Sequence, residues 1–151
     1  MSLQLERRID TEEGAASRTA PLEAVWQDGR MEHADRPTVL IIDDHTGFRA
    51  FARALLDSEG FQVIGEAPDG RSGLADARRL QPDVVLLDVQ LPDSDGFEVA
   101  TQLAGDGART AVILTSSRDV RDYGTLVSEC GARGFIPKAE LSGAALAALA
   151  P

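Results

Sequence analysis

Short apolar runs alternate along this chain with segments whose apolar residues follow helical spacing. The runs at 39–42 and 84–87 contain only β-branched and leucine residues, which is typical of strands buried on both faces of a parallel sheet. Less uniform runs at 61–65, 111–114 and 134–137 predict three more strands. The apolar pattern therefore predicts a five-stranded framework.

The segments between these runs predict five helices, around residues 48–56, 74–80, 97–103, 120–130 and 141–150. Gly60 ends the first and Pro82 closes the second, whereas Gly124 lies inside the fourth and weakens it. Successive parallel strands are joined by right-handed crossovers, so this alternation predicts an α/β fold. In that fold a doubly wound parallel sheet carries helices on both faces.

Residues 1–37 differ from the rest of the chain because they are polar, mixed in charge and without sustained periodicity. They predict a flexible N-terminal extension, followed by one domain over residues 38–151. A docking motif around Leu22, Val25 and Trp26 is the alternative for part of this extension. A further hypothesis is that translation begins naturally at Met31, shortly before the first strand.

Composition limits the possible partners. The formal net charge of −10 argues against nucleic-acid binding by this polypeptide, because a phosphate backbone needs a basic surface. No apolar run approaches the roughly 20 residues of a membrane span. The single cysteine, Cys130, excludes an internal disulfide and is expected to be structural, which suits a reducing cytoplasm. We therefore expect a cytoplasmic protein without membrane contact.

Chemically reactive side chains follow four of the five predicted strands: Asp43 and Asp44, Asp88, Thr115, and Lys138, the only lysine. Ligands of such sheets bind beyond the carboxyl ends of the strands. Three neighbouring carboxylates repel one another, so at least one pKa should be raised, and their oxygens are suitable ligands for Mg²⁺. Because a carboxylate can serve as a covalent nucleophile, this edge could accept a phosphoryl group.

Four motifs carry a family resemblance: Leu-Ile-Ile-Asp-Asp-His, Val-Val-Leu-Leu-Asp-Val-Gln-Leu-Pro-Asp-Ser-Asp-Gly, Val-Ile-Leu-Thr-Ser-Ser and Gly-Phe-Ile-Pro-Lys. In this order they resemble the receiver domain of bacterial two-component response regulators, over residues 38–150. The resemblance implies a flavodoxin-like fold with strand order 2-1-3-4-5, which places the acids after the first strand beside Asp88.

The resemblance also implies a role for each site residue. Asp88 would be the phosphoacceptor, attacking a phosphohistidine of a sensor histidine kinase or phosphotransfer protein. Lys138 and Thr115 would bind the phosphoryl oxygens. The implied Mg²⁺ ligands are Asp44 directly, Asp43 mainly through water, Asp88, and the backbone carbonyl of Gln90. The chain would then be a phosphoacceptor with self-catalysed transfer and dephosphorylation, and not an enzyme acting on a separate substrate.

The output implied by the resemblance is a change of surface. Thr115 would move towards the phosphoryl group and Phe135 would turn inward. The surface of the fourth helix, fifth strand and fifth helix would change with them. This surface would serve a downstream effector, an output domain or a phosphorylation-dependent homodimer. Gln90 and Ser117 occupy positions where the family tunes hydrolysis.

Other interpretations remain at this stage. Asp44 could only cap the first helix, Phe135 could be plain packing, and His45 is interpreted as a solvated residue at that helix start. A phosphatase of the haloacid-dehalogenase type would also use Mg²⁺ and an Asp nucleophile, but Gln90 stands where it would need a second Asp. A scaffold that is never phosphorylated is another alternative. The Lys-x-x-Leu pattern at Lys138 also fits a receiver taken from a longer DNA-binding regulator.

Overall fold

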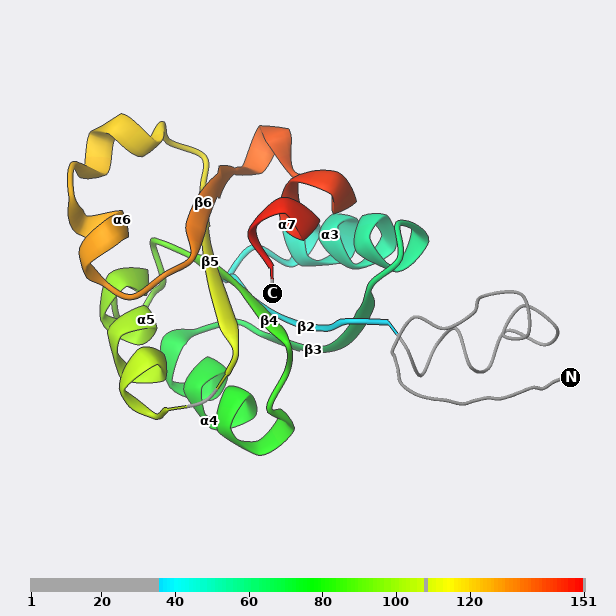
Figure 1. Cartoon of the computed structure of the whole chain (residues 1–151), viewed down its shortest axis with the longest axis horizontal. Helices are drawn as coiled ribbons and strands as arrows, with labels where there is room; N and C mark the ends of the chain where they lie inside the picture. The colour runs from blue at the N-terminus through cyan, green and yellow to red at the C-terminus, as the bar shows by residue number, and fades with distance from the viewer. Residues whose placement is uncertain (1–35, 108, 151) are drawn as a thin grey trace, which may run out of the picture. The chain divides into compact units, whose positions relative to one another are not determined.

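A five-stranded parallel sheet forms the centre of the part of the chain that the computed structural model describes, residues 36–107 and 109–150 (Figure 1). Its strands are β2 (Thr38–Ile42), β3 (Gln62–Ala67), β4 (Val84–Asp88), β5 (Ala111–Ser116) and β6 (Gly134–Pro137). They lie in the order β3-β2-β4-β5-β6, which confirms the predicted 2-1-3-4-5 arrangement. The predicted extension and the hypothesis about Met31 fall outside the described residues.

Helices cover both faces of the sheet, as predicted (Figure 1). One face carries α3 (Thr46–Ser58) and α7 (Gly143–Leu149), and the other carries α4 (Gly70–Leu80), α5 (Gly96–Gly105) and α6 (Leu126–Glu129). Every residue of β4 is buried, because this central strand sends side chains into both cores. None of the helices in the described ranges has the length and apolar character needed to cross a bilayer.

The strand register brings the reactive positions level with one another. Ile42 pairs with Leu87, so the next residues along the chain, Asp43 after β2 and Asp88 at the end of β4, are neighbours. Asp88 pairs with Thr115 on its other side. Ser116 pairs with Pro137, the residue before Lys138. The carboxyl ends of four strands therefore supply one site.

The predicted helix over residues 120–130 is wrong as a continuous element. It is divided into the 3₁₀ turn η1 (Val120–Tyr123) and α6, because Gly124 between them adopts φ 58° and ψ −128°. Backbone at such angles is open essentially to glycine alone. The last helix is also shorter than predicted: the 3₁₀ turn η2 (Lys138–Glu140) comes first, and Ser142 Oγ caps α7 by accepting from Ala145 N at 3.0 Å.

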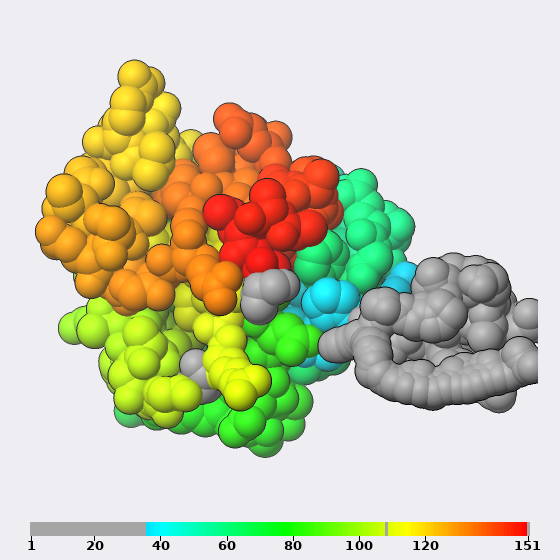
Figure 2. All heavy atoms as spheres, viewed as in Figure 1, coloured from blue at the N-terminus to red at the C-terminus, as the bar shows by residue number. Residues whose placement is uncertain are grey.

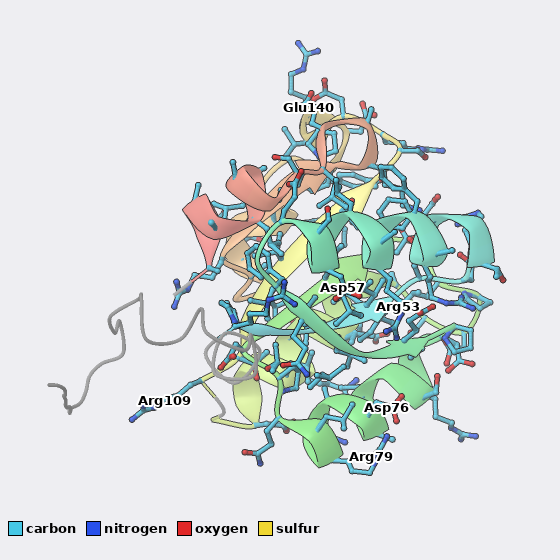
Figure 3. The ribbon with its side chains drawn as sticks, turned by 90° about the vertical axis from the view of Figure 1, so that its right-hand side faces the viewer. Arg53, Asp57, Asp76, Arg79, Arg109 and Glu140 are labelled. Atoms are coloured by element: carbon cyan, nitrogen blue, oxygen red, sulfur yellow. The ribbon has the colours of Figure 1, made fainter. Side chains whose placement is uncertain are left out.

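Two side chains of α3 fasten this helix to the edge strand β3, and both are labelled in Figure 3. Asp57 Oδ1 accepts a hydrogen bond from Val63 N at 3.0 Å. Arg53 donates to Glu66 at 2.6 Å and to the carbonyl oxygen of Val63 at 3.3 Å. The helix that follows the first acid pair is thus held in place by the neighbouring strand.

Candidate functional site

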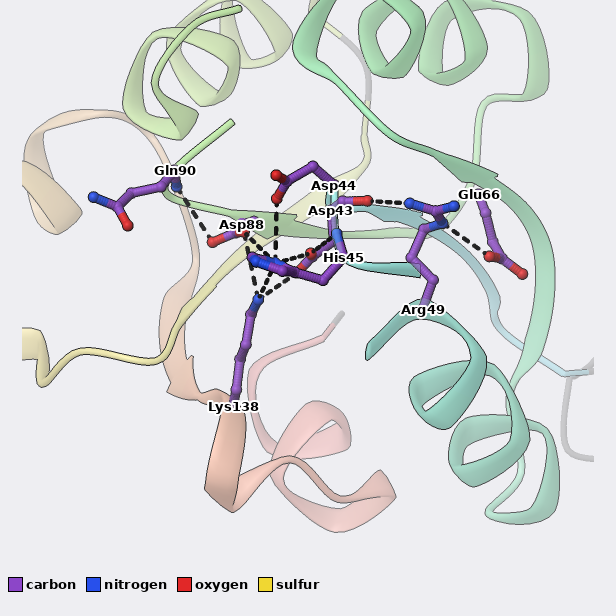
Figure 4. Close-up of polar contacts among 8 residues, drawn as sticks. All are labelled: Asp43, Asp44, His45, Arg49, Glu66, Asp88, Gln90 and Lys138. Atoms are coloured by element: carbon purple, nitrogen blue, oxygen red, sulfur yellow. Dashed lines mark hydrogen bonds and ion pairs between the residues drawn. The ribbon is translucent and has the colours of Figure 1, made fainter. Parts of the chain in front are cut away.

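Three carboxylates and one amine meet at the carboxyl edge of the sheet (Figure 4). Asp43, directly after β2, is fully buried, and Asp88, the last residue of β4, is 3% exposed. Asp44 lies at the rim, with 38% of its side chain exposed. The predicted grouping of these residues is therefore present in the structure.

Lys138 supplies the positive charge of the site. Its Nζ lies 2.7 Å from Asp43 Oδ2 and 3.4 Å from Asp88 Oδ2, and the side chain is only 15% exposed. The ammonium also lies 4.6 Å from the centroid of the Phe48 ring, a favourable cation–π distance. One cation thus compensates two buried carboxylates, whose burial without a partner would be costly.

Asp88 is the carboxyl group whose ionisation is most clearly perturbed. Burial, and after it the negative charge of Asp43, raises the pKa of Asp88 from 3.8 to about 6. Lys138 and a hydrogen bond from the backbone N–H of Gln90, at 3.2 Å, act in the opposite direction. A raised pKa was expected from crowded acids, but burial contributes more than repulsion does.

Thr115 contributes a hydroxyl that has no hydrogen-bond partner in this structure. The residue is fully buried, and its Oγ1 is unsatisfied. It pairs with Asp88 across the sheet. A buried hydroxyl without a partner costs free energy, and such groups are commonly kept where a ligand will satisfy them.

His45 lies closer to the acids than its interpretation as a solvated helix-start residue implies. It is the N-cap residue of α3, and its side chain is 66% exposed. Its Nδ1, however, lies 3.0 Å from Asp43 Oδ1 and 3.2 Å from Asp44 Oδ1. The alternative that Asp44 caps this helix is wrong, because His45 holds the N-cap position.

A positioning network behind the acids had no signal in the sequence. Arg49 donates to the carbonyl oxygen of Asp43 at 2.6 Å and to Glu66 at 3.1 Å. The hydrogen bond from Arg53, followed by that from Arg49, lowers the pKa of Glu66 despite its partial burial. Glu66 is distant in sequence, so only the β2–β3 pairing reveals that this network fixes the turn after β2 (Figure 4).

The remaining predicted residues lie around this centre. The side chain of Gln90 points away from the acids, and only its backbone faces Asp88 (Figure 4). Phe135 packs against Tyr123, with ring centroids 5.9 Å apart, in the core beneath α6. Its proposed rotation stays a prediction.

The donor set fits a divalent cation. One atom from each of four residues, Asp43, Asp44, His45 and Asp88, can be chosen so that all lie within 4.8 Å of one another. The three carboxylates are hard oxygen ligands of the kind that Mg²⁺ uses, together with water and phosphate oxygens. The lysine and the unsatisfied threonine stand beside them as groups for an anion.

Fold and site together define a class: a doubly wound parallel α/β domain whose acids, lysine and threonine gather at the strand ends. Residues 39–149 match the family model of the response regulator receiver domain. The chain therefore belongs to the response regulator receiver domain family.

Curated relatives and solved structures agree with this membership. The chain is 39% identical over 102 residues to the transcription regulator BvgA of Bordetella pertussis, a match covering 68% of this chain and 49% of BvgA. It is 36% identical over 101 residues to the response regulator GacA of Pseudomonas viridiflava, covering 66% of this chain and 47% of GacA. The signal receiver domain of NarL from Mycobacterium tuberculosis superposes with a TM-score of 0.68 at 34% identity, covering 76% of this chain and 96% of that one.

The matches also show how the chain compares in length with its relatives. It spans about half the length of the curated regulators that it matches, 49% of BvgA and 47% of GacA.

Proposed function

We propose that this chain receives a phosphoryl group on Asp88 from a sensor histidine kinase or a phosphotransfer protein, as the input step of a phosphorelay. One observation carries the proposal: the nearly buried Asp88 lies 3.4 Å from Lys138 Nζ and pairs across the sheet with Thr115, whose buried hydroxyl is unsatisfied. This arrangement presents a nucleophile, a cation and a hydrogen-bond donor to the same phosphoryl group.

The proposed reaction follows from these three groups. An ionised oxygen of Asp88 attacks phosphorus, an O–P bond forms, and the bond from phosphorus to the donor nitrogen breaks. Lys138 Nζ stabilises charge on the phosphoryl oxygens, and Thr115 Oγ1 donates a hydrogen bond to one of them. Phosphoryl transfer depends mainly on such alignment and charge neutralisation.

The proposed cofactor is Mg²⁺, held by Asp44, Asp88, the backbone carbonyl of Gln90 and, mainly through water, Asp43. When bound, it would supply further charge neutralisation and orient the phosphoryl oxygens. The Arg49–Glu66 pair supports this role, because it holds the backbone from which Asp43 projects. The receiver itself would be residues 38–151, with residues 1–37 as an extension.

The proposed output is a change of the surface made by α6, β6 and α7. Figure 2 shows these segments, gold to red, side by side on one face. Phosphorylation adds roughly two negative charges beside Thr115, the strand neighbour of Asp88. Because η1 and α6 are short, this face is the part of the domain that such a change could shift. The shifted face would bind an effector, an output domain or a second copy of the chain.

A second candidate function is favoured by the lengths of the relatives. The chain covers only 49% of a longer transcription regulator. We propose as the alternative that this receiver controls a DNA-binding output domain in the same way. Direct DNA contact by the present chain is disfavoured by its net charge of −10.

Intact mass spectrometry after incubation with Mg²⁺ and acetyl phosphate tests the proposal. We expect a single phosphoryl adduct on the wild type and none on Asp88→Asn or in the presence of EDTA. Asp106→Asn is the matched control, because Asp106 is exposed at the opposite end of α5, where it pairs with Arg78, and this variant should still be phosphorylated. An adduct that persists in Asp88→Asn would show that the acceptor lies elsewhere.

A further inference from the structure

The imidazole of His45 extends the acid cluster into a site with mixed oxygen and nitrogen donors. Its Nδ1 lies 3.0 Å from Asp43 Oδ1, 3.2 Å from Asp44 Oδ1 and 4.0 Å from Asp88 Oδ2 (Figure 4). Asp43 holds both parts of the residue, because the backbone N–H of His45 donates to Asp43 Oδ1 at 2.8 Å and Nδ1 hydrogen-bonds the same oxygen. The nitrogen therefore faces the same space as the three carboxylates.

These separations match the edges of a metal coordination polyhedron. Ligand atoms about 2.0–2.2 Å from one ion lie roughly 2.8–3.6 Å apart in octahedral or tetrahedral geometry. The distances from Nδ1 to Asp43 and Asp44 already fall in this range, and the distance to Asp88 exceeds it by only a few tenths of an ångström. No rearrangement of the strands is needed to complete the set.

The chemistry of the fourth donor, an imidazole nitrogen, decides which metal ions it binds well. Mg²⁺ prefers oxygen ligands and retains water, whereas Zn²⁺ and Co²⁺ bind imidazole nitrogen well. Lys138 Nζ lies 3.5 Å from the same Nδ1. The carboxylates whose charge the lysine compensates are therefore the ones that a bound metal ion would contact. His45 is also at the exposed rim of the site, with 66% of its side chain accessible to solvent.

We propose that His45 is a fourth protein ligand for imidazole-preferring divalent ions, with Zn²⁺ as the representative. The site then has two loaded forms: Mg²⁺ bound through oxygens alone, and Zn²⁺ bound through the carboxylates and His45 Nδ1. This inference rests on the proposed function because it uses the same carboxylates. His45 thereby sets the cation selectivity of the receiver site.

Calorimetric titration of the metal-free full chain with MgCl₂ and with ZnCl₂ tests this role. His45→Asn should lower the ratio of Zn²⁺ to Mg²⁺ affinity by about tenfold or more. Asparagine is itself a good N-cap, so α3 should persist in this variant. His33→Asn is the matched control, since His33 is the only other histidine of the chain, and its ratio should equal that of the wild type.

The ¹⁵N resonances of the imidazole rings provide a direct readout of ligation. Saturating Zn²⁺ should shift Nδ1 of His45 in the wild type and no longer do so in Asp44→Asn. An affinity ratio that is the same in His45→Asn and wild type, or a His45 resonance that Zn²⁺ does not move, would overturn the inference. A normal Zn²⁺ response without any phosphoryl adduct would instead reject the proposed function alone.

Discussion

At the scale of single residues, the site is a balance between burial and charge. Two carboxylates that are almost completely removed from water share one ammonium group, and the balance is tuned so that Asp88 keeps a pKa of about 6. Near neutral pH most of Asp88 is then ionised and nucleophilic, yet its charge is only partly compensated. The site is thus prepared for both a cation and a phosphoryl group.

This balance predicts a pH-dependent stability of the metal-free protein. The pKa of Asp88 is raised, so its stabilising contribution is complete below about pH 4 and is lost as the pH rises through about 6. In EDTA, Asp88→Asn should therefore become more stable than the wild type over this interval. The difference should reach at most about 3 kcal/mol at pH 7.

Urea unfolding of both proteins at several pH values measures this difference. Asp76→Asn, which changes a carboxylate in the exposed i,i+3 pair with Arg79, is the control and should not develop the same trend. A stability difference that stays constant from pH 4 to pH 7 would contradict the raised pKa.

Lys138 predicts a second effect on Asp88. Lys138→Met removes the nearest positive charge, which now lowers the pKa of Asp88, so that pKa should rise further above 6. Loss of the ammonium also removes the closest cation from the buried Asp43, which should cost about 3 kcal/mol at pH 7.

A ¹³C NMR titration of the Asp88 carboxyl carbon measures the shift. Arg109→Met, which removes an exposed cation elsewhere on the surface, is the matched control (Figure 3). Finding the Asp88 pKa unmoved in Lys138→Met would mean that the ion pair is absent in solution.

At the scale of elements, the loop after β4 is fixed by a very close approach. Gly96 N donates to the carbonyl oxygen of Val89 at 2.6 Å, and a Cβ on Gly96 would lie 2.3 Å from the carbonyl oxygen of Asp88. Asp95 then caps α5 by accepting from Glu98 N at 2.8 Å. The first turn of α5 therefore determines where the backbone of the phosphoacceptor lies.

Gly96→Ala should consequently displace the end of β4. We expect a loss of about 1–3 kcal/mol in the free energy of unfolding together with slower phosphorylation of Asp88, because backbone cannot move aside as a side chain can. Gly105→Ala in the same helix has open space around its Cβ position and should be neutral or stabilising. Equal behaviour of the two variants in urea unfolding would show that the close approach has no energetic consequence.

A hydrogen bond between two side chains ties the segment after β5 to the end of that strand. Tyr123 OH lies 2.7 Å from Ser116 Oγ, and the Tyr123 ring packs edge-on against Phe97, with ring centroids 5.4 Å apart. Tyr123→Phe keeps the ring and removes the bond, so it should cost about 0.5–1.5 kcal/mol.

Amide exchange locates this effect. Residues 119–130 should exchange faster in Tyr123→Phe while β4 and β5 keep their protection. Ser128→Ala is the control, because it removes a hydroxyl of the same segment that bonds only to the nearby carbonyl of Thr125. Unchanged exchange in Tyr123→Phe would mean that packing alone holds η1.

These elements also show where prediction from sequence succeeds. Strong apolar runs located the strands, and the crossover rule with the family resemblance gave their order. The grouping of the acids, Thr115 and Lys138 could be predicted because each lies at a strand end, and strand ends are easy to locate. The break at Gly124, the Tyr123–Ser116 bond and the Arg49–Glu66 network were missed, since each depends on a tertiary contact that no local pattern encodes. The contacts of His45 with the acids were also missed, because they depend on how the chain turns after β2.

At the scale of the whole molecule, the acid edge couples cation binding to the folded state. The carboxylates come from different strands, so the site exists only when β2 and β4 are paired. A cation that binds there should raise the stability of the domain, by about 2.7 kcal/mol at one hundred times the dissociation constant.

Thermal unfolding in MgCl₂ measures this coupling. The midpoint should rise with Mg²⁺ in the wild type and much less in Asp44→Asn, with KCl at matched ionic strength as the control for screening of the net charge of −10. An equal rise in KCl would assign the effect to general screening.

The solitary lysine has a practical consequence for labelling. Fourteen of the fifteen basic residues are arginines, so apart from the amino terminus the only primary amine of the chain is the one beside Asp43 and Asp88. Reagents that acylate amines would therefore modify Lys138 and remove the positive charge of the site. The extent of acylation at Lys138 becomes a reporter of what occupies the pocket, and immobilisation or dye coupling should use other chemistry.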